Sequence, residues 1–199
     1  MIKKFICGSF FSNCYLLVND KKCIIIDPGL NFNKYAEIIK KEYDVVAILL
    51  THGHIDHIDG LKYFDVPIYI YKDEVPFLED ADLALYSLFN VKKDFDVSRL
   101  NIVKINDNYL IDLLDFKIKV IHTPGHTVGS VCYLYENNLF SGDTLFNLSV
   151  GRVDFPTGDF KQLDSSLKKL FNLPADTIVY PGHGEATTIG FEKNNNPYR

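Results

Sequence analysis

Short apolar runs that end at turn-forming residues recur along the chain, and they favour a fold of layered strands and helices. Residues 23–26, 45–50, 68–70 and 178–180 are such runs, and each is typical of a buried strand. Residues 116–120 instead alternate apolar and charged side chains, which is the period of a strand with one face in water. The chain therefore contains both buried and half-exposed strands.

Helical spacing of apolar residues occurs between these runs. Residues 35–39 and 160–171 each predict an amphipathic helix, and Asp159 is a natural N-cap with Gln162 three residues later. One or two short helices are expected between residues 73 and 99, a segment that could flank a site. Strands that interleave with helices predict a layered α/β domain.

Length and composition are those of one ordinary globular domain. A chain of 199 residues can bury roughly 70% of its unfolded surface, so we expect a single domain over residues 1–199. It is 47% hydrophobic and 24% charged, and it has no run of 18 apolar residues to predict a membrane span. The apolar start is soon broken by Ser9, Ser12 and Asn13, so we interpret it as a strand, and expect a cytoplasmic protein with no membrane partner.

The charge pattern argues against nucleic acid as a partner. Lys and Arg number 21 against 26 Asp and Glu, for a net charge of −5, and only Arg99, Arg152 and Arg199 are arginines. No basic stripe is available to bind a phosphate backbone. The four cysteines form no Cys-x-x-Cys motif, so we expect reduced, buried thiols rather than a disulfide framework.

Three of the six histidines lie in one short stretch, His52-Gly-His54-Ile-Asp56-His57. The stretch follows the predicted strand over residues 45–50, and side chains two apart on extended backbone point the same way, so His52 and His54 can share one metal ion. Asp56 and His57 then face the position of a second metal ion. The alternative is a polar loop in which Asp56 merely caps a short helix.

Other candidate ligands also follow predicted strands. His126 comes after Thr-Pro-Gly, Asp143 lies in Ser-Gly-Asp-Thr, and His183 lies in Pro-Gly-His-Gly. The carboxyl ends of strands are where open α/β sheets usually place their sites. A lone histidine after Pro-Gly is more often a turn residue than a ligand, but three such turns together favour a metal site.

Taken in order, these motifs resemble the metallo-β-lactamase superfamily, and within it the small, single-domain glyoxalase II-like (hydroxyacylglutathione hydrolase-like) enzymes. The segments are residues 51–57, 123–127, 142–144 and 181–184, and Gly-Arg-Val-Asp-Phe-Pro at 151–156 adds to the likeness. The resemblance runs nearly from end to end. It implies a four-layer αββα sandwich, with two mixed β-sheets flanked by helices.

The resemblance also implies a ligand set. On it, His52, His54 and His126 bind a first metal, Asp56, His57 and His183 bind a second, and Asp143 bridges the two. The cofactors would be two divalent ions, with zinc expected and iron or manganese as alternatives. The implied activity is hydrolysis of a thioester such as an acylglutathione, or of a related ester, by a hydroxide that bridges the metals. Asp56 could also transfer protons while it binds its metal.

Three further residues have open roles. Asp27 could orient a ligand histidine, or could cap a Pro-Gly turn. We expect His122 to be a hydrogen-bonded structural residue rather than a substrate contact. Arg152 could meet a substrate carboxylate, or could form a structural salt bridge.

Other functions remain open beside the hydrolase. The persulfide dioxygenases resemble this sequence too and use a single iron held by two His and one Asp. A nuclease or phosphodiesterase is disfavoured by the acidic charge, and a β-lactamase is disfavoured because a bridging Asp143 is the glyoxalase II pattern. A non-catalytic metal-binding module is also possible.

Full-length glyoxalase II enzymes carry a C-terminal helical domain with glutathione contacts, and 16 residues after His183 are too few to hold one. The sequence therefore does not identify the thiol that forms the thioester substrate.

Overall fold

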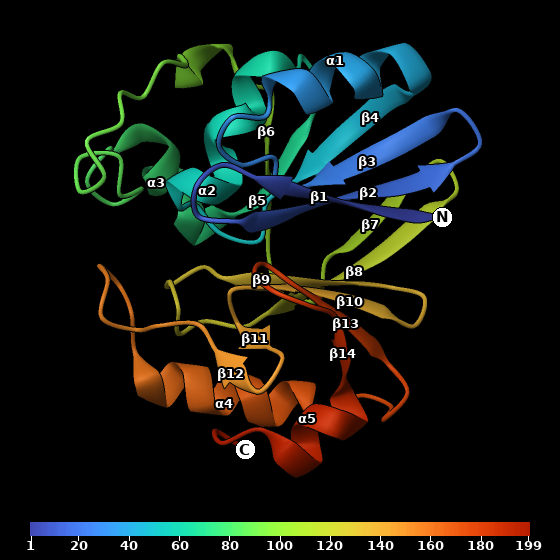
Figure 1. The fold of residues 1–199 in the computed structure, drawn as a ribbon, viewed down its shortest axis with the longest axis vertical. Helices are drawn as coiled ribbons and strands as arrows, with labels where there is room; N and C mark the ends of the chain where they lie inside the picture. The colour runs from blue at the N-terminus through green and yellow to red at the C-terminus, as the bar shows by residue number, and fades with distance from the viewer. The chain divides into compact units, whose positions relative to one another are not determined.

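The computed structural model describes all 199 residues. It divides into two compact units, Met1–Ile105 and Asn106–Arg199, whose elements are labelled in Figure 1. The expectation of a single domain over residues 1–199 stays a prediction. No helix in either unit combines the length and apolar character needed to cross a membrane.

The first unit is built on a six-stranded mixed sheet in the order β1-β2-β3-β4-β5-β6. The strands are β1 Ile2–Cys7, β2 Ser12–Asn19, β3 Lys22–Ile26, β4 Asp44–Leu49, β5 Ile68–Tyr71 and β6 Ile102–Ile105. Strands β1 to β3 pair in antiparallel fashion, and β3 to β6 pair in parallel. The apolar runs that predict strands in this half of the chain coincide with β3, β4 and β5, which confirms them.

Short helices complete the first unit. They are α1 Asn33–Glu42, α2 Ile55–Ile58, α3 Val75–Glu79 and the 3-10 turns η1 Asp59–Tyr63, η2 Lys72–Glu74 and η3 Val97–Arg99. Helix α1 confirms the predicted helix and buries Ala36 and Ile39, whereas Ile38 is exposed because it lies off that narrow stripe. The short helices expected between residues 73 and 99 are also present.

The second unit carries another six-stranded mixed sheet, in the order β14-β13-β10-β9-β8-β7. Its strands are β7 Leu110–Leu113, β8 Phe116–His122, β9 Val131–Tyr135, β10 Asn138–Gly142, β13 Ile178–Pro181 and β14 Thr187–Thr188. A separate two-stranded ribbon pairs β11 Leu145–Phe146 with β12 Ser149–Val150. Burial alternates along the start of β8, as its sequence predicts.

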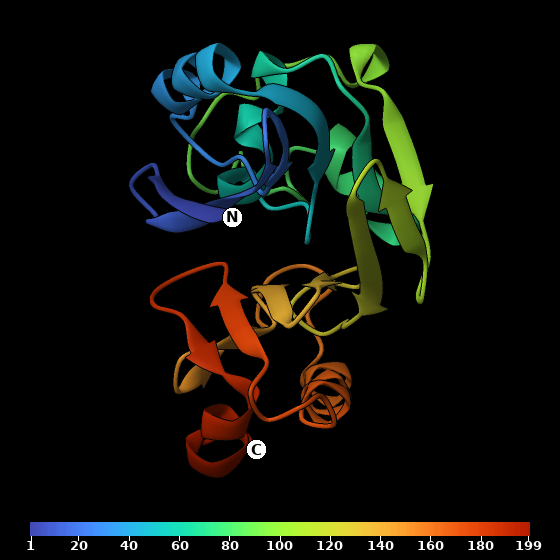
Figure 2. The same cartoon turned by 90° about the vertical axis from the view of Figure 1, so that its right-hand side faces the viewer.

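Two helices, α4 Phe160–Leu170 and α5 Ile189–Asn195, cover one face of this sheet (Figure 2). Leu163, Leu167 and Leu170 of α4 pack on Leu139 and Val179 of the sheet in one buried cluster. The helix begins where predicted, because the Asp159 carboxylate accepts hydrogen bonds from two backbone N–H groups, those of Lys161 and Gln162. These bonds lower the pKa of Asp159. The two sheets, each mixed and each flanked by helices, match the predicted class.

All four cysteines are free and buried, as predicted. Burial raises the pKa of the Cys132 thiol to about 11, and that of Cys23 to about 12. At pH 8 only about one Cys132 thiol in a thousand would be a thiolate. We therefore expect iodoacetamide to label Cys23 and Cys132 slowly in the folded protein, and to label all four thiols once it is unfolded, as read by mass spectrometry. Rapid labelling of Cys23 or Cys132 in the folded state would contradict this burial.

Candidate metal centre

In the first unit, two parallel strands bring Asp27 and Thr51 to the same edge of the sheet. Strand β3 ends at Ile26 and pairs with Leu49 of β4, and the Asp27 N–H donates to the Leu49 carbonyl. The Thr51 backbone N–H then donates to Asp27 Oδ1 at 2.8 Å, and its hydroxyl donates to Oδ2 at 2.6 Å. These hydrogen bonds hold Thr51, the residue before His52, in place at the carboxyl ends of β3 and β4.

Asp27 also contacts His57, so of the two roles left open for it, contact with a candidate ligand is the one observed. The Oδ2 atom lies 3.0 Å from His57 Nδ1. Because an ionised carboxylate can only accept, the imidazole donates from Nδ1, and Nε2 carries the lone pair. Asp27 lies in the left-handed region at φ 53°, which an aspartate tolerates better than most residues.

His52 is held in the same tautomer through Thr51. The hydroxyl oxygen of Thr51 lies 3.1 Å from His52 Nδ1. Its single proton goes to Asp27, so this oxygen accepts from Nδ1 and leaves the lone pair of His52 on Nε2. The ring centroids of His52 and His57 are 4.2 Å apart. One ligand atom from each of Asp27, His52 and His57 falls within 4.8 Å of the others, so the three side chains form one compact group.

His54 completes the stretch on a tightly packed turn. Its ring lies 4.8 Å from that of His52 and 5.9 Å from that of Phe77, centroid to centroid. The Gly53 N–H donates to the buried Glu74 carboxylate at 2.7 Å. A Cβ on Gly53 would fall 2.2 Å from the Cβ of Phe77, so this close approach requires glycine.

Asp56 lies within α2 rather than capping it, so the capping alternative is wrong. His54 is the N-cap of α2, and Asp56 occupies its first turn. The Asp56 carboxylate is 3.5 Å from His57 Nε2, the nitrogen that carries the lone pair. Ser12 donates its hydroxyl to the Asp56 carbonyl at 2.6 Å, which ties α2 to the start of β2.

In the second unit, Asp143 lies between the other two candidate histidines. Its Oδ2 atom is 3.6 Å from His126 Nε2 and 3.5 Å from His183 Nε2. Asp143 follows β10, and His183 follows β13, which pairs with β10 in parallel. As in the first unit, parallel pairing brings the residues after two strands to one sheet edge.

His126 is oriented by a backbone carbonyl. Its Nδ1 lies 2.7 Å from the carbonyl oxygen of Arg152. A carbonyl can only accept, so Nδ1 is the donor and Nε2, on the Asp143 side, carries the lone pair. The His183 ring instead packs edge-on against Phe146, with centroids 5.9 Å apart.

The remaining two residues with open roles have structural partners. His122 Nε2 lies 3.1 Å from the Val128 carbonyl at the end of β8, as expected of a structural histidine. Arg152 forms a two-pronged salt bridge with Asp154 at 2.6 and 2.5 Å, and stacks 4.0 Å above the Phe155 ring. The hydrogen bond from Arg152 lowers the pKa of Asp154 to about 2.

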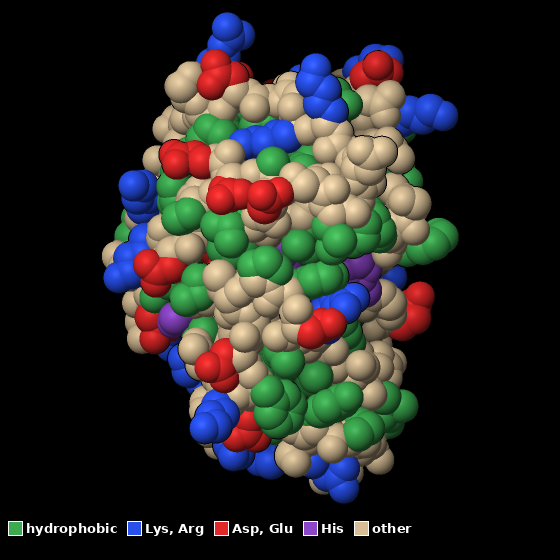
Figure 3. Space-filling view, turned by 90° about the vertical axis from the view of Figure 1, so that its left-hand side faces the viewer, with side chains coloured by type: hydrophobic (Ala, Val, Ile, Leu, Met, Phe, Trp, Pro, Cys, Tyr) green, Lys and Arg blue, Asp and Glu red, His purple; other side chains and the backbone are tan.

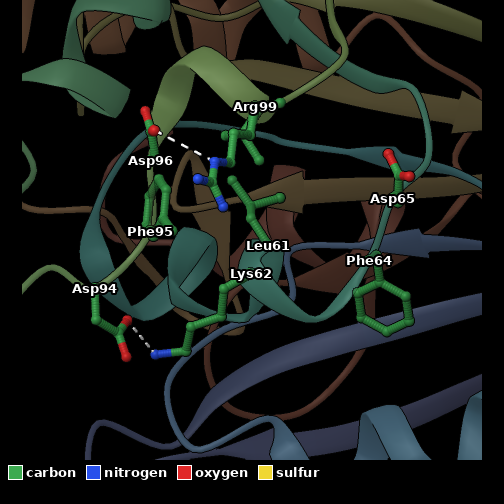
Figure 4. Close-up of a pocket in the computed structure, with 9 residues that line it drawn as sticks. Leu61, Lys62, Phe64, Asp65, Asp94, Phe95, Asp96 and Arg99 are labelled. Carbon is green, nitrogen blue, oxygen red and sulfur yellow. Dashed lines mark hydrogen bonds and ion pairs between the residues drawn. The ribbon is translucent and has the colours of Figure 1, made fainter.

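Two cavities differ in their relation to these residues. In the first unit, a cavity of about 600 Å³ contains none of the candidate ligands, and its side chains pair with one another as Lys62–Asp94 and Arg99–Asp96 (Figure 4). In the second unit, a cavity of about 410 Å³ includes a candidate ligand among its walls, which are formed by Phe146, Asn147, Ser149, His183, Gly184 and Glu185. The second cavity therefore gives a ligand molecule access to His183.

The donors of both units fit divalent metal ions. Three imidazoles, those of His52, His57 and His126, present Nε2 lone pairs while Nδ1 is held by an acceptor. This is the usual arrangement of metal-binding histidines, and carboxylates of the Asp56 and Asp143 kind complete such sets. Imidazole and carboxylate donors suit zinc, iron and manganese.

Replacing Asp27 by asparagine is expected to lower metal affinity by about 10- to 100-fold without unfolding the protein. An amide has one acceptor oxygen, and it cannot serve Thr51 and His57 as the carboxylate does. Chelator competition would measure the affinity. Asp159→Asn is the matched control, since asparagine caps a helix about as well as aspartate. Wild-type affinity in Asp27→Asn would rule out this orienting role.

Comparison with known proteins places these motifs in a family. The family model described as "Metallo-beta-lactamase superfamily" matches residues 7–183. A probable metallo-hydrolase of Streptococcus pyogenes is 39% identical over 198 residues, covering 94% of this chain and 84% of that protein. The hydroxyacylglutathione hydrolase GloC of Haemophilus influenzae is 34% identical over 202 residues, covering 96% and 93%.

Solved structures agree with this fold. The BLEG-1 B3 metallo-β-lactamase superimposes with a TM-score of 0.92 at 38% identity, over 100% of this chain and 99% of that one. TTHA1623, solved in a di-iron-bound form, has a TM-score of 0.86 at 34% identity, over 99% and 100% of the two chains. The predicted fold of two mixed sheets flanked by helices is thereby confirmed, and the chain belongs to the metallo-β-lactamase superfamily.

Proposed function

We propose that this protein is a binuclear metal-dependent hydrolase that cleaves a thioester of the acylglutathione kind or a related ester. The observation that carries the proposal is the position of Asp143, whose Oδ2 lies within 3.6 Å of Nε2 in both His126 and His183. A carboxylate oxygen beside two imidazoles is suited to bridge a pair of ions. The relative named hydroxyacylglutathione hydrolase supports the choice of substrate class.

In this proposal the candidate ligands serve one pair of metals. His52, His54 and His126 would hold the first ion, Asp56, His57 and His183 the second, and Asp143 would bridge them. The order of the motifs along the chain supports this partition, as does membership of the superfamily. We propose zinc as the metal, with iron or manganese as alternatives, and a solved relative is a di-iron form.

When bound, the two ions supply a hydroxide nucleophile at neutral pH and polarise the substrate carbonyl. The protein's own residues orient and transfer protons. Asp27 and the Arg152 carbonyl fix the rings of His57 and His126 through Nδ1. Asp56, only 15% exposed, would accept a proton from the attacking water and return it to the departing thiolate. The cavity beside His183 would receive part of the substrate.

β-Lactam hydrolysis is a second candidate, which the likeness to a B3 metallo-β-lactamase favours. The bridging position proposed for Asp143 supports the thioesterase instead. A mononuclear iron dioxygenase acting on persulfides is a third candidate. It differs from the thioesterase and the β-lactamase because it consumes oxygen and needs one metal only.

One set of assays separates these activities. The purified, metal-loaded protein is incubated with S-lactoylglutathione, with a chromogenic cephalosporin, and with glutathione persulfide in an oxygen electrode. We expect thioester hydrolysis that a chelator abolishes and that added metal restores. Faster turnover of the cephalosporin, or oxygen uptake with the persulfide, would overturn the proposal.

A further inference from the structure

Two segments of the second unit form the walls of the cavity of about 410 Å³ that contains His183. One wall is the turn of the two-stranded ribbon, in which Asn147 and Leu148 connect β11 to β12. The other wall is formed by residues 183–185, which follow β13 and lead into β14. The width of the cavity therefore depends on the spacing between the turn and this segment.

Glu192 of α5 is hydrogen-bonded toward both walls. Its side chain is fully buried. The Oε2 atom accepts the N–H of Leu148, within the turn, at 3.0 Å. The Oε1 atom accepts the hydroxyl of Thr187 at 2.6 Å, and Thr187 lies two residues after Glu185 at the start of β14. One carboxylate thus connects the two walls.

Asn196 supports this connection from the end of α5. It is also fully buried, and its Nδ2 atom donates to Glu192 Oε2 at 2.7 Å and to the Ser149 carbonyl at 3.1 Å. The turn is therefore held through an N–H group and through a carbonyl group. A buried network whose members are bonded to one another favours a single arrangement, and removing the carboxylate leaves its donors without an acceptor.

The turn is one that needs such support. Leu148 has a φ of 56°, in the left-handed region that bulky side chains rarely adopt. Its side chain is 46% exposed, so side-chain packing does little to hold the residue there. Such backbone strain persists where surrounding contacts enforce it, and the hydrogen bond from the Leu148 N–H to Glu192 is a contact of this kind.

The position of His183 depends on the same walls. Its side chain is 28% exposed, whereas those of His57 and His126 are 0% and 3% exposed. On the face of the molecule in Figure 3, histidine side chains reach the surface in small areas only. The His183 ring packs edge-on against Phe146, which pairs with Ser149 beside the turn. A shift of the turn would therefore move the ring against which His183 packs.

We propose that Glu192 is a positioning residue, which holds the two walls at the spacing that admits the substrate beside His183. This inference rests on the proposed function, because it takes the cavity to receive part of the thioester. Glu192 acts through Leu148 and Thr187 and touches no reacting atom. Its loss should therefore weaken substrate binding more than it slows the chemical step.

The first test is the kinetics of the metal-loaded protein with S-lactoylglutathione. In Glu192→Ala we expect KM to rise at least about fivefold, with kcat and metal content within about twofold of wild type. Glu192→Gln should restore the wild-type KM, because its oxygen can accept from Leu148 and its amide can donate to the Thr187 oxygen. Lys193→Met is the matched control on α5, since Lys193 donates to the Phe171 carbonyl instead, at 3.2 Å.

A wild-type KM in Glu192→Ala would overturn the positioning role while leaving the hydrolase intact. An equal rise of KM in Glu192→Gln would also overturn it, because that variant keeps both walls connected. If Glu192→Ala does not fold, Thr187→Val removes only the bond to the second wall. There we expect KM to rise about threefold, and an unchanged KM would contradict the proposal.

The second test needs no turnover. The ring signals of the six histidines are recorded by NMR on metal-free protein, and the signal of His183 is identified by its absence in His183→Asn. We expect this signal to shift in Glu192→Ala, because it depends on the distance to the Phe146 ring, and to stay in place in Glu192→Gln and Lys193→Met. An unchanged signal in Glu192→Ala would overturn the proposal. A shifted signal in a protein that hydrolyses no thioester would support the positioning by Glu192 and contradict the proposed function alone.

Discussion

Replacing Asp143 by asparagine is expected to remove most of the bound metal and to lower thioester hydrolysis by at least about 100-fold. The Asp143 carboxylate lies 3.6 and 3.5 Å from the Nε2 atoms of His126 and His183. Asparagine keeps the size of the side chain but removes the negative charge, so in the proposed centre both ions lose a ligand at once. Metal analysis and the thioester assay on the same preparation would measure the two losses.

Asp164→Asn is the matched control for this variant. Asp164 forms a surface ion pair with Lys168 on α4, and such pairs contribute little to stability. We expect this control to keep wild-type metal content and rate. If Asp143→Asn did the same, Asp143 would not be a metal ligand.

Replacing Gly151 by alanine is expected to reduce the free energy of unfolding by about 3 kcal/mol. A Cβ at this position would lie 1.8 Å from the Asp143 carbonyl oxygen and 3.2 Å from His126 Cγ. A backbone carbonyl cannot rotate away as a flexible side chain can, so the two chain segments must separate. For a chain of this size the loss corresponds to roughly 6–12 °C in Tm, and we expect metal content to fall as Asp143 and His126 shift.

Gly184→Ala separates crowding from backbone strain. Gly184 has a φ of +76°, yet nothing lies within 4 Å of a Cβ built on it. Alanine there should cost about 1 kcal/mol. Thermal unfolding of the two metal-free variants would show the difference, and equal Tm values would mean that the approach of Gly151 to Asp143 imposes no constraint.

Much of the fold was predictable because local patterns carry it. The apolar runs predict β3, β4, β5 and β13, and Asp159 predicts the start of α4. Strand β2 was missed although it is largely buried, because it opens with polar Ser12 and Asn13. The Ser12 hydroxyl is satisfied by the Asp56 carbonyl, 44 residues away, a contact that no local pattern shows. Phe160 also fits the helical spacing of apolar residues, but its side chain is 52% exposed because it is the first residue of α4.

The sequence predicts the candidate ligands but not the groups that orient them. Side chains such as His52 and His126 carry a motif, so spacing and family resemblance identify them. The Arg152 group that orients His126 is a backbone carbonyl, which every residue possesses and which leaves no trace in the residue types. Glu74, which holds the Gly53 N–H from 21 residues away, gave no signal because one acidic residue near a helix start is common.

The metal content of the purified protein, measured together with its activity, tests the central claim most directly. The proposed centre predicts close to two divalent ions per chain, and hydrolysis of S-lactoylglutathione that rises in proportion to occupancy. A single tightly held iron, with oxygen consumed in the presence of glutathione persulfide and no thioester hydrolysis, would contradict it.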